Sequence, residues 1–431
     1  PCKTACPAHI AVQGYINLAA QGRYLDALKL IKKDNPFPAV CGSICNRRCE
    51  EACTRGDVDR AVAIDEIKKF VAEQELQADK RYIPKVITHR GIADPYPEKI
   101  AIIGAGPAGL SCAYYLANMG YENVTVFDKN EVPGGMLTLG IPSFRLEKDV
   151  VNAEIEVLRE MGVHFQCGVE IGKDLTIDQL REQGYKGFYL AIGAQKSAPI
   201  GVPGEELSGV YGGVDFLRKV NLGKKPRIGK KCAVIGGGNV AMDAARCAKR
   251  LGAEQVYIVY RRGMAELPAR KEEVEHAEEE GVIFDLLRNP VEILEDRTGS
   301  PSPRAADFNP NYGNVIGIKV QKQKLGEPDA SGRRRPVPVT VEEDPEAIYT
   351  IPCDCVIIAI GTTPNPLIKH TTPGIETNKH GCLIVNEETN ETTKDGVFAG
   401  GDAVTGAATV ILAMGAGRKA AKAIDEYIQK K

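Results

Sequence analysis

Residues Ile100–Leu110, I-A-I-I-G-A-G-P-A-G-L, decide the fold of this chain. The apolar, β-branched half predicts a strand, and the small residues of Leu110–Met119 predict a helix, so the glycines form the turn between them. In such a turn Gly104 permits the tight bend, Gly106 lets the backbone approach a pyrophosphate, and Gly109 lets the helix pack on the strand. The helix N-terminus then faces the phosphates with free N–H groups. The stretch therefore predicts a Rossmann-like dinucleotide site.

An acidic and a basic residue downstream suit the same ligand. The next apolar run, Val124–Phe127, ends at Asp128, about 20 residues after the turn, where the fingerprint expects an acid. A carboxylate there can accept hydrogen bonds from ribose hydroxyls. Arg145 follows a second glycine pair, Gly134-Gly135, and its guanidinium suits flavin pyrophosphate oxygens; an ordinary surface arginine is the alternative.

The C-terminal run Gly396–Ala403 adds a further acid and leads into a helix predicted over residues 409–429. Asp402 can hydrogen-bond a ribityl chain, and the helix dipole can stabilise a reduced, anionic flavin ring; a helix-entry cap is the alternative role. These features predict an FAD site. Its expected residues are Gly104, Gly106, Pro107, Ala108, Gly109, Asp128, Lys129, Gly135, Met136, Arg145, Gly193, Gly401, Asp402, Thr409 and Val410.

The strand–turn–helix pattern recurs at Lys231–Leu251, with G-G-G-N-V-A as the turn. The strand predicted at Gln255–Tyr260 ends in Arg261-Arg262 instead of an acid. An acid would favour the free 2′-hydroxyl of NAD, whereas arginines favour the 2′-phosphate of NADP. A solvated basic turn is the alternative. We predict an NADP(H) site formed by Gly236, Gly238, Asn239, Val240, Arg261, Arg262, Arg270 and Gly361.

An internal repeat sets the domain organisation. The apolar run Cys355–Gly361 echoes Leu190–Gly193, so one dinucleotide domain is inserted into the other. We predict an α/β fold: a helical iron–sulfur domain at 1–95, an FAD-binding domain at 96–225 and 362–431, and an NADP(H)-binding domain at 226–361. A polar linker is expected at Gln77–Glu98, and loops are expected at Asp296–Asn314 and Glu327–Pro345, with Arg333–Arg335 a solvated turn.

Six of the 13 cysteines fall within the first 53 residues, at Cys2, Cys6, Cys41, Cys45, Cys49 and Cys53. Helices are predicted at Ile10–Lys33 and Val62–Leu76. Iron–sulfur clusters need four thiolate ligands, and a Cys-Pro pair such as Cys6-Pro7 is typical of such a site. Structural zinc is the alternative, but its usual C-x2-C pairs are absent. Six thiolates do not divide into fours, so either two are spare or a second cluster takes other ligands.

Composition and charge exclude several functions. The formal net charge is −2 and the isoelectric point about 6.4, so nothing favours binding to nucleic acid or an anionic membrane. No apolar stretch approaches the ~20 residues of a membrane span. We see no signal peptide and expect a cytoplasmic protein.

The expected chemistry needs no catalytic side chain. Hydride transfer between a nicotinamide and a flavin requires alignment, not a protein acid or base. A disulfide reductase would carry a cysteine pair near its flavin, but Cys112 is single and Gly134–Leu146 has no cysteine. Electrons are therefore expected to leave the flavin through the cysteine-dense segment.

The motifs together resemble the glutamate synthase small-subunit family. They are N-P-F-P-A-V-C-G, G-A-G-P-A-G-L, G-G-M-L-T-L-G-I-P-S-F-R-L, G-G-G-N-V-A-M-D, V-Y-R-R and F-A-G-G-D-A, and they cover nearly the whole chain. The family includes the large subunit of NADH-dependent reduced ferredoxin:NADP oxidoreductase and the N-terminal part of dihydropyrimidine dehydrogenase. The resemblance implies FAD, NADPH and [4Fe–4S] clusters that pass electrons to a partner. It also implies that Asp128, Met136, Arg145 and Asp402 contact FAD; that Asn239, Val240, Arg261 and Arg262 contact NADPH; that Cys6, Cys45 and Cys49 share one cluster; and that Cys2 and Cys53 belong to another.

The sequence departs from this family in two places. The spacing Cys45-x3-Cys49 is shorter than the usual C-x5-C, and Lys68 stands where relatives supply a Gln or Glu ligand. The fourth ligand of the Cys6 cluster is therefore open, with Cys41 a candidate. The short spacing resembles flavin subunits of ferredoxin-linked complexes, some of which bifurcate electrons.

Three hypotheses follow for the function. The first is an electron-transfer subunit, from NADP(H) through FAD and iron–sulfur to a partner redox subunit, in a ferredoxin-linked transhydrogenase-type complex with or without bifurcation. The second is the glutamate synthase small subunit. The third is a non-catalytic assembly subunit, against which the intact Arg261, Arg262 and Asp402 argue.

Overall fold

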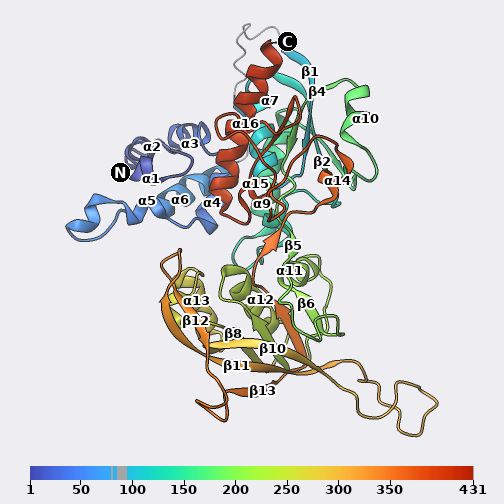
Figure 1. Cartoon of the computed structure of the whole chain (residues 1–431). Helices are drawn as coiled ribbons and strands as arrows, with labels where there is room; N and C mark the ends of the chain where they lie inside the picture. The colour runs from blue at the N-terminus through green and yellow to red at the C-terminus, as the bar shows by residue number, and fades with distance from the viewer. Residues whose placement is uncertain (79–80, 85–94, 431) are drawn as a thin grey trace. The chain divides into compact units, whose positions relative to one another are not determined.

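The computed structural model describes residues 1–78, 81–84 and 95–430, so part of the predicted linker Gln77–Glu98 lies outside the described residues. The chain forms two compact units, Pro1–Gln195 with Thr363–Lys431, and Lys196–Thr362. One unit is thus inserted into the other, as the repeat predicted. Figure 1 shows the elements of both units.

The first unit is built on a five-stranded parallel sheet of order β16-β4-β1-β2-β3. Its strands are β1 (Tyr96–Ile103), β2 (Tyr121–Asp128), β3 (His164–Cys167), β4 (Tyr185–Leu190) and β16 (Val397–Ala399). Its helices are α7 (Pro107–Asn118), α8 (Met136–Leu139), α9 (Lys148–Glu160), α10 (Ile177–Glu182), α14 (Leu367–Thr371), α15 (Asp402–Thr405) and α16 (Val410–Lys430). The last four residues of the central strand β1, Ile100–Ile103, are all apolar and buried, as expected where helices cover both faces of a parallel sheet.

The cysteine-dense segment is helical. Its elements are α1 (Cys2–Ala5), α2 (Val12–Ala20), α3 (Tyr24–Lys32), α4 (Pro38–Ile44), α5 (Arg48–Glu51), the 3₁₀ turn η1 (Thr54–Asp57) and α6 (Ile64–Leu76). The single helix predicted at Ile10–Lys33 is wrong. It is broken at Gly22, whose φ of 72° ends α2, because apolar periodicity alone does not register a glycine that leaves the helical region.

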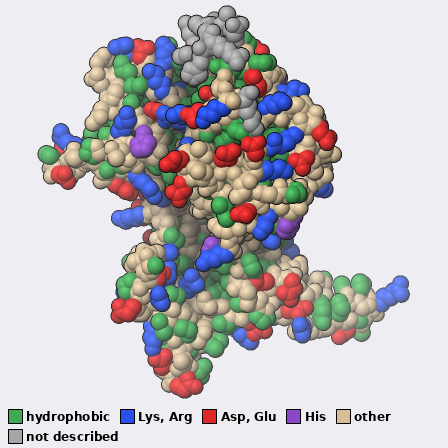
Figure 2. Space-filling view, turned by 45° about the horizontal axis from the view of Figure 1, so that its top comes forward, with side chains coloured by type: hydrophobic (Ala, Val, Ile, Leu, Met, Phe, Trp, Pro, Cys, Tyr) green, Lys and Arg blue, Asp and Glu red, His purple; other side chains and the backbone are tan. Residues whose placement is uncertain are grey.

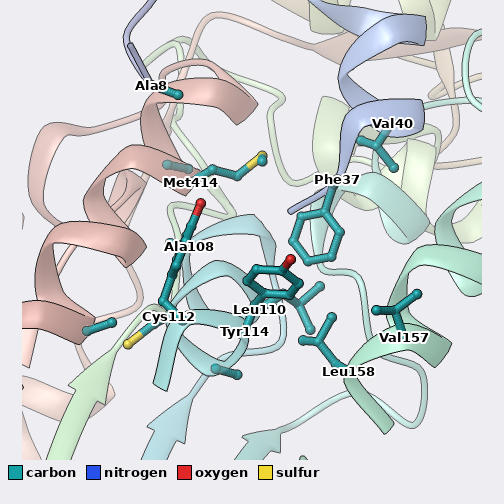
Figure 3. Packing of buried hydrophobic residues seen from close by; sticks show 14 of the residues in the cluster. Ala8, Phe37, Val40, Ala108, Leu110, Cys112, Tyr114, Val157, Leu158 and Met414 are labelled. Atoms are coloured by element: carbon teal, nitrogen blue, oxygen red, sulfur yellow. The ribbon is translucent and has the colours of Figure 1, made fainter. Parts of the chain in front are cut away.

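The helical segment packs on the first sheet's helices instead of forming a core of its own. Phe37 and Val40 join Tyr114 of α7 and Leu158 of α9 in one buried cluster (Figure 3). The Glu154 carboxylate on α9 accepts hydrogen bonds from the Ala39 and Val40 N–H groups, at 2.9 and 3.0 Å. This carboxylate satisfies the free amides at the start of α4 and fixes that helix against α9.

The second unit repeats the parallel sheet in the order β6-β14-β7-β8-β9. Its strands are β6 (Val210–Gly212), β7 (Lys231–Ile235), β8 (Gln255–Tyr260), β9 (Ile283–Leu286) and β14 (Cys355–Ile358). Its helices are α11 (Gly213–Asn221), α12 (Asn239–Arg250), η2 (Met264–Glu266) and α13 (Lys271–Glu279). An antiparallel sheet is added by β10 (Arg288–Glu295), β11 (Val315–Pro328), β12 (Arg334–Pro338) and β13 (Ile348–Pro352), and β5 (Lys196–Ser197) pairs with β15 (Thr362–Thr363).

Two sequence-based boundaries need correction. The second unit begins near Lys196, not at residue 226, because the short strand β6 hydrogen-bonds to β14 of the second sheet. The loop expected at Glu327–Pro345 contains β12, which pairs with β11 as a hairpin. Its sequence, R-R-P-V-P, carries no strand pattern that reasoning from periodicity could find.

No helix among the described residues is long and apolar enough to cross a membrane. Figure 2 shows acidic and basic side chains interspersed over the visible face, in keeping with the net charge of −2.

The contact between α16 and α7 yields a stability prediction. A Cβ on Gly417 would lie 2.2 Å from the Ala108 carbonyl oxygen and 2.9 Å from the Cys112 nitrogen. Gly417→Ala should therefore destabilise the protein by about 1–3 kcal/mol, despite the better helix propensity of alanine. Chemical denaturation would measure the change.

Gly415→Ala is the matched control on the same helix. Its Cβ would meet only the Pro7 oxygen, at 3.5 Å, an ordinary contact. It should be neutral or stabilising by up to about 1 kcal/mol. Equal losses in the two variants would contradict the claim that α7 and α16 require the missing side chain at Gly417.

Candidate functional site

Steric contacts explain two glycines of the first turn, Gly104 and Gly109. Gly104 has φ of 112°, and a Cβ there would lie 2.3 Å from the Ala191 oxygen beyond β4. A Cβ on Gly109 would lie 1.9 Å from the Gly104 oxygen. The turn therefore presses against β4 while α7 presses against the turn. Gly106 is the N-cap of α7 and Pro107 its first residue, a position where the missing proline N–H costs nothing.

A second glycine loop meets the first. Gly135 has φ of 54°, and a Cβ on it would lie 2.7 Å from the Gly106 Cα. The Gly134 N–H donates to the Ala105 oxygen at 2.8 Å. Two glycine-containing backbone segments thus meet at the α7 N-terminus. Because these glycines have no side chains, a pyrophosphate could approach the backbone closely there. Met136 follows as the first residue of α8, and a Cβ on Gly140 would touch its side chain.

Asp128 holds the turn together. One carboxylate oxygen accepts from the Ala105 N–H at 2.8 Å, and the other accepts from both the backbone and the side-chain amide of Asn130, each at 2.8 Å. The side chain is buried. Three of its roughly four acceptor positions are filled from within the protein, so at most one remains for a ribose hydroxyl. The ribose contact stays a prediction, whereas the structural role is plain.

Asp402 lies beside the same helix end. The preceding Gly401 has φ of 65°, and a Cβ on it would lie 2.8 Å from the Ala108 Cβ. Burial raises the pKa of Asp402 to about 6, although the Ala408 N–H, which donates to its carboxylate at 3.2 Å, acts in the opposite direction. The Thr409 hydroxyl, just before α16, is buried without a hydrogen-bond partner among the described residues. An acid and an unpaired hydroxyl at this place fit a polar ligand such as a flavin's ribityl chain.

The remaining predicted FAD residues lie around these loops. Lys129 is exposed after β2, and Arg145 is half-buried between α8 and α9. Gly193, with φ of 66°, follows β4, and Val410 begins α16. The contacts of these four residues with FAD stay predictions.

The second turn repeats the geometry of the first. Gly236 has φ of 136°, and a Cβ on it would lie 2.3 Å from the Ala359 oxygen, just as for Gly104 and Ala191. The Ala359 N–H donates to the Ile235 oxygen at 2.8 Å, as the Ala191 N–H does to the Ile103 oxygen. The repeat predicted from sequence is therefore present in the backbone itself.

Open space surrounds the second turn where a ligand is expected. A Cβ on Gly238, the N-cap of α12, or on Gly361 would meet nothing within 4 Å. The Asn239 side-chain oxygen accepts from the Arg270 N–H at 2.9 Å and joins the starts of α12 and α13. Val240 packs instead against Gly213 of α11.

The three predicted arginines differ in their surroundings. Arg261 is exposed, with no acidic partner among the described residues. Arg262 is only 6% exposed, and its guanidinium pairs with Asp329 in the β11–β12 turn, while its Nε has no hydrogen-bond partner in the described part of the chain. Arg270 pairs with Glu272. Hydrogen bonds from the Ser331 hydroxyl and amide, aided by Arg262, lower the pKa of Asp329 to about 2.

Sequence reasoning missed Asp329 because it lies 67 residues from Arg262, in a stretch expected to be a loop. The interpretation of Arg333–Arg335 as a solvated turn is also wrong for Arg334. This residue lies on β12, and its Nε is 2.6 Å from the buried Glu266 carboxylate. Two ion pairs thus join the β11–β12 hairpin to the segment after β8, one to Arg262 and one to Glu266 of η2.

The cysteines of the helical segment fall into two environments. Cys45 and Cys6 both act on Cys49: burial, and next Cys45 and then Cys6, raise the pKa of the Cys49 thiol to about 12. Cys53 is different, because hydrogen bonding to the backbone of Val62, Arg55 and Gly56 lowers its pKa. Backbone N–H groups directed at sulfur are a feature of iron–sulfur sites.

Cys41 and Cys2 are both buried. The Cys41 thiol donates to the Met414 sulfur on α16 at 3.6 Å. Among the described residues, no three His, Cys, Asp or Glu side chains converge on a point that would hold a single metal ion. A four-iron cluster is bound by thiolates spread over its corners, and Cys6, Cys45 and Cys49 would supply three of them.

The raised pKa of Asp402 predicts that the folding stability of the flavin-free protein falls as this carboxyl ionises. A carboxyl with pKa about 6 when folded and about 3.9 when unfolded favours folding while protonated; this stability is present below pH 4 and is lost as the pH rises to 6. Asp402→Asn should therefore gain up to about 3 kcal/mol over the unmodified protein between pH 4 and pH 7. Urea unfolding at intervals across this range would measure it, and parallel profiles for the two proteins would contradict it.

Comparison with known proteins agrees with this geometry. Residues 98–420 match the family model of pyridine nucleotide-disulphide oxidoreductases, and residues 1–80 match that of dihydropyrimidine dehydrogenase domain II, 4Fe-4S cluster. The chain is 41% identical to the NADP(+)-dependent formate dehydrogenase subunit beta of Moorella thermoacetica, over all of this chain but 60% of that protein. It is 38% identical to the glutamate synthase [NADPH] small chain of Halomonas elongata, over 99% of this chain and 88% of that one.

A solved structure shares the fold. Mycobacterium tuberculosis FprA in complex with NADPH matches with a TM-score of 0.63 at 17% identity, over 78% of this chain and 85% of that one. The present chain spans about three fifths of the length of the Moorella relative. It belongs to the pyridine nucleotide-disulphide oxidoreductases, in the group that contains the glutamate synthase small chain, with FAD, NADP(H) and [4Fe–4S] as its cofactors.

Proposed function

We propose that this chain passes electrons between NADP(H), FAD and a [4Fe–4S] cluster to a partner redox subunit. When bound, these cofactors supply the redox chemistry: the two electrons of a hydride pass from NADPH to the flavin and leave singly through the cluster to an acceptor. The chain's own residues bind and align the cofactors, and no side chain need act as acid or base.

One observation carries the proposal: the cysteine segment packs directly on the helix that begins at the candidate flavin site. Cys41 contacts Met414 through sulfur at 3.6 Å, and Arg418 pairs with Asp34 at 2.7 Å. Both partners lie on α16, whose first turn follows Thr409 and Asp402. The cysteine segment and α16 thus share one packed core, which supports electron transfer between the proposed cluster and the proposed flavin site.

In the second unit, Arg261 is the arginine that a 2′-phosphate would meet without displacing an acid. Arg262 and Arg270 are already paired with Asp329 and Glu272. A 2′-phosphate can replace a carboxylate on a guanidinium, but the displaced Asp329 carboxylate would remain nearby and oppose it. We therefore assign the preference for NADP(H) chiefly to Arg261, because the ion pair with Asp329 reduces what Arg262 can contribute.

The partner stays a proposal. The relatives are named as a beta subunit and a small chain, which supports a multi-subunit complex. We favour a ferredoxin-linked, transhydrogenase-type complex, with or without electron bifurcation, in the cytoplasm, where thiols stay reduced and available to iron.

The second candidate is the glutamate synthase small subunit. It is favoured by the 88% coverage of the Halomonas small chain. Glutamate formation from glutamine and 2-oxoglutarate by the purified complex would decide for it.

An anaerobic titration tests the proposed function. NADPH should bleach the flavin absorbance of the purified protein at low concentration, and the electron paramagnetic resonance signal of a reduced cluster should follow. NADH at the same concentration should do neither. If neither nucleotide reduces the flavin, or if the protein holds no iron, the chain is not this electron carrier.

Arg261→Ala should weaken NADPH binding about tenfold or more and leave NADH unchanged, because it removes a charge-assisted hydrogen bond to the 2′-phosphate alone. Arg297→Ala, an exposed arginine on the loop at 296–314 of the same unit, is the matched control. Equal affinity for NADPH in all three proteins would leave Arg261 as part of a solvated turn.

Asp329→Asn should tighten NADPH binding several-fold at low salt, because it frees Arg262 and removes an anion that repels the phosphate. Asp344→Asn, which breaks the Lys322–Asp344 pair on the same antiparallel sheet, should have no effect. Weaker binding in Asp329→Asn would instead mean that the acid orients Arg262 for the phosphate.

A further inference from the structure

Helix α6 carries a charged lysine in the interior of the cysteine segment. Lys68 is 5% exposed, and its Nζ lies 2.5 Å from the Asp65 carboxylate, itself 2% exposed. Arg47 faces the other Asp65 oxygen at 3.5 Å. Deprotonating Lys68 would leave Asp65 buried with one weaker partner, so the pair holds the ammonium in its charged form.

The Lys68 ammonium acts on the cysteines. Burial raises the pKa values of the Cys41 and Cys49 thiols, and the Lys68 charge opposes both rises, while Cys41 and Cys45 in turn raise the pKa of Lys68. Burial alone would lower the pKa of Lys68, yet the pKa is raised, because Asp65 and these sulfurs attract the charge. Asp65 is its sole hydrogen-bond acceptor among the described residues, so two of its three N–H donors remain for acceptors that a bound cluster would bring.

Backbone packing fixes the lysine beside the cysteines. A Cβ on Gly42 would lie 2.7 Å from the Lys69 Cβ, so α4 and α6 are in near backbone contact next to Lys68. Cys41 and Cys45 stand four residues apart on and just after α4, which places both on one face. The Asp65 N–H donates to Glu50 at 2.8 Å and ties α6 to the segment that carries Cys49.

A second buried ion pair on α6 has no such neighbours. Lys32 of α3 contacts both oxygens of Glu75, at 2.7 and 2.9 Å, and lies near the Tyr82 ring. Among the described residues, no cysteine forms a hydrogen bond with Lys32 or Glu75. Lys32 anchors α3 to α6, so a buried lysine on this helix bundle need not act on sulfur, and the Lys32–Glu75 pair offers a matched control.

We propose that the cluster is held by four thiolates, Cys6, Cys41, Cys45 and Cys49, and that Lys68 is not a ligand but a fixed charge that donates hydrogen bonds to its sulfur atoms and raises its midpoint potential. The proposal rests on the function proposed above. An ammonium has no lone pair for iron, so the fourth ligand must come from another residue. A nearby positive charge stabilises the reduced, more negative cluster, which raises the potential.

Iron content and spectra of the purified holoprotein test the ligand set. Cys41→Ala should lose a cluster, seen as four fewer irons per flavin and the loss of its reduced-state resonance, whereas Lys68→Met should keep it. Cys112→Ala, a buried cysteine on α7 outside this group, should also keep it. Loss of the cluster in Lys68→Met together with retention in Cys41→Ala would make Lys68 the ligand and overturn the proposal.

Potentiometry tests the charge. The Lys68 charge has a larger effect on the pKa of Cys41 than the Asp65 charge has. The double variant Lys68→Met with Asp65→Asn should therefore lower the cluster's midpoint potential. Replacing both members of the ion pair avoids leaving one of them buried alone. The single variant Lys68→Arg keeps the positive charge and should have the midpoint potential of the unmodified protein. The double variant Lys32→Met with Glu75→Gln should also leave that potential unchanged. An unchanged potential in the Lys68 double variant would overturn the charge role.

The two proposals fail in different ways. If NADPH does not reduce the flavin, or no cluster is present, the proposed function fails whatever Lys68 does. If NADPH reduces both centres normally in the unmodified protein while the variants leave ligation and potential unchanged, only the inference about Lys68 fails.

Discussion

The direct contact of α7 with α16 is the constraint on which the rest of the first unit depends. Gly417 admits the Ala108 carbonyl at a distance that no side chain would allow. Because α7 begins at the glycine turn and α16 begins next to Thr409, this contact fixes two helix N-termini relative to one another. Further along α16, Met414 and Arg418 meet the cysteine segment. Helix α16 therefore contacts both α7 and the cysteine segment and begins next to Thr409. The small residue Gly417 permits the close packing on α7.

The two units use one backbone solution for different chemistry. Gly104 and Gly236 take similar positive φ values and press against equivalent carbonyls, Ala191 and Ala359, at the same distance. The difference lies one strand later. Asp128 turns inward and ties its own turn together, whereas Arg261 remains exposed and Arg262 pairs across to the hairpin. The repeat supplies two similar turns for dinucleotides, and we propose that the residues at the end of the second strand decide which dinucleotide each turn prefers.

Short sequence patterns were enough to predict the strands and turns that depend on residues close together in the chain. The strands β7 and β8 lie where periodicity placed them, and the glycine turns were identified from residues within a dozen positions. The errors have a different origin. The strand β6 has three half-buried residues and exists because β14 accepts it as a neighbour. The Arg262–Asp329 pair joins residues 67 positions apart. Such features depend on tertiary partners, which residue patterns do not specify.

The two buried lysines of the helical segment show why the ligand question could not be settled from sequence. Both are ion-paired to an acid of α6, and residue type alone would assign both the same role. Their surroundings separate them: Lys32 has both oxygens of its acid, whereas Lys68 shares Asp65 with Arg47, and Cys41 and Cys45 help to raise its pKa. Burying an ion pair costs more than it returns unless its remaining donors are satisfied. For Lys32 the protein alone satisfies that requirement; for Lys68 the requirement is met only when the sulfur atoms beside it carry negative charge, as the thiolates of an iron–sulfur cluster do.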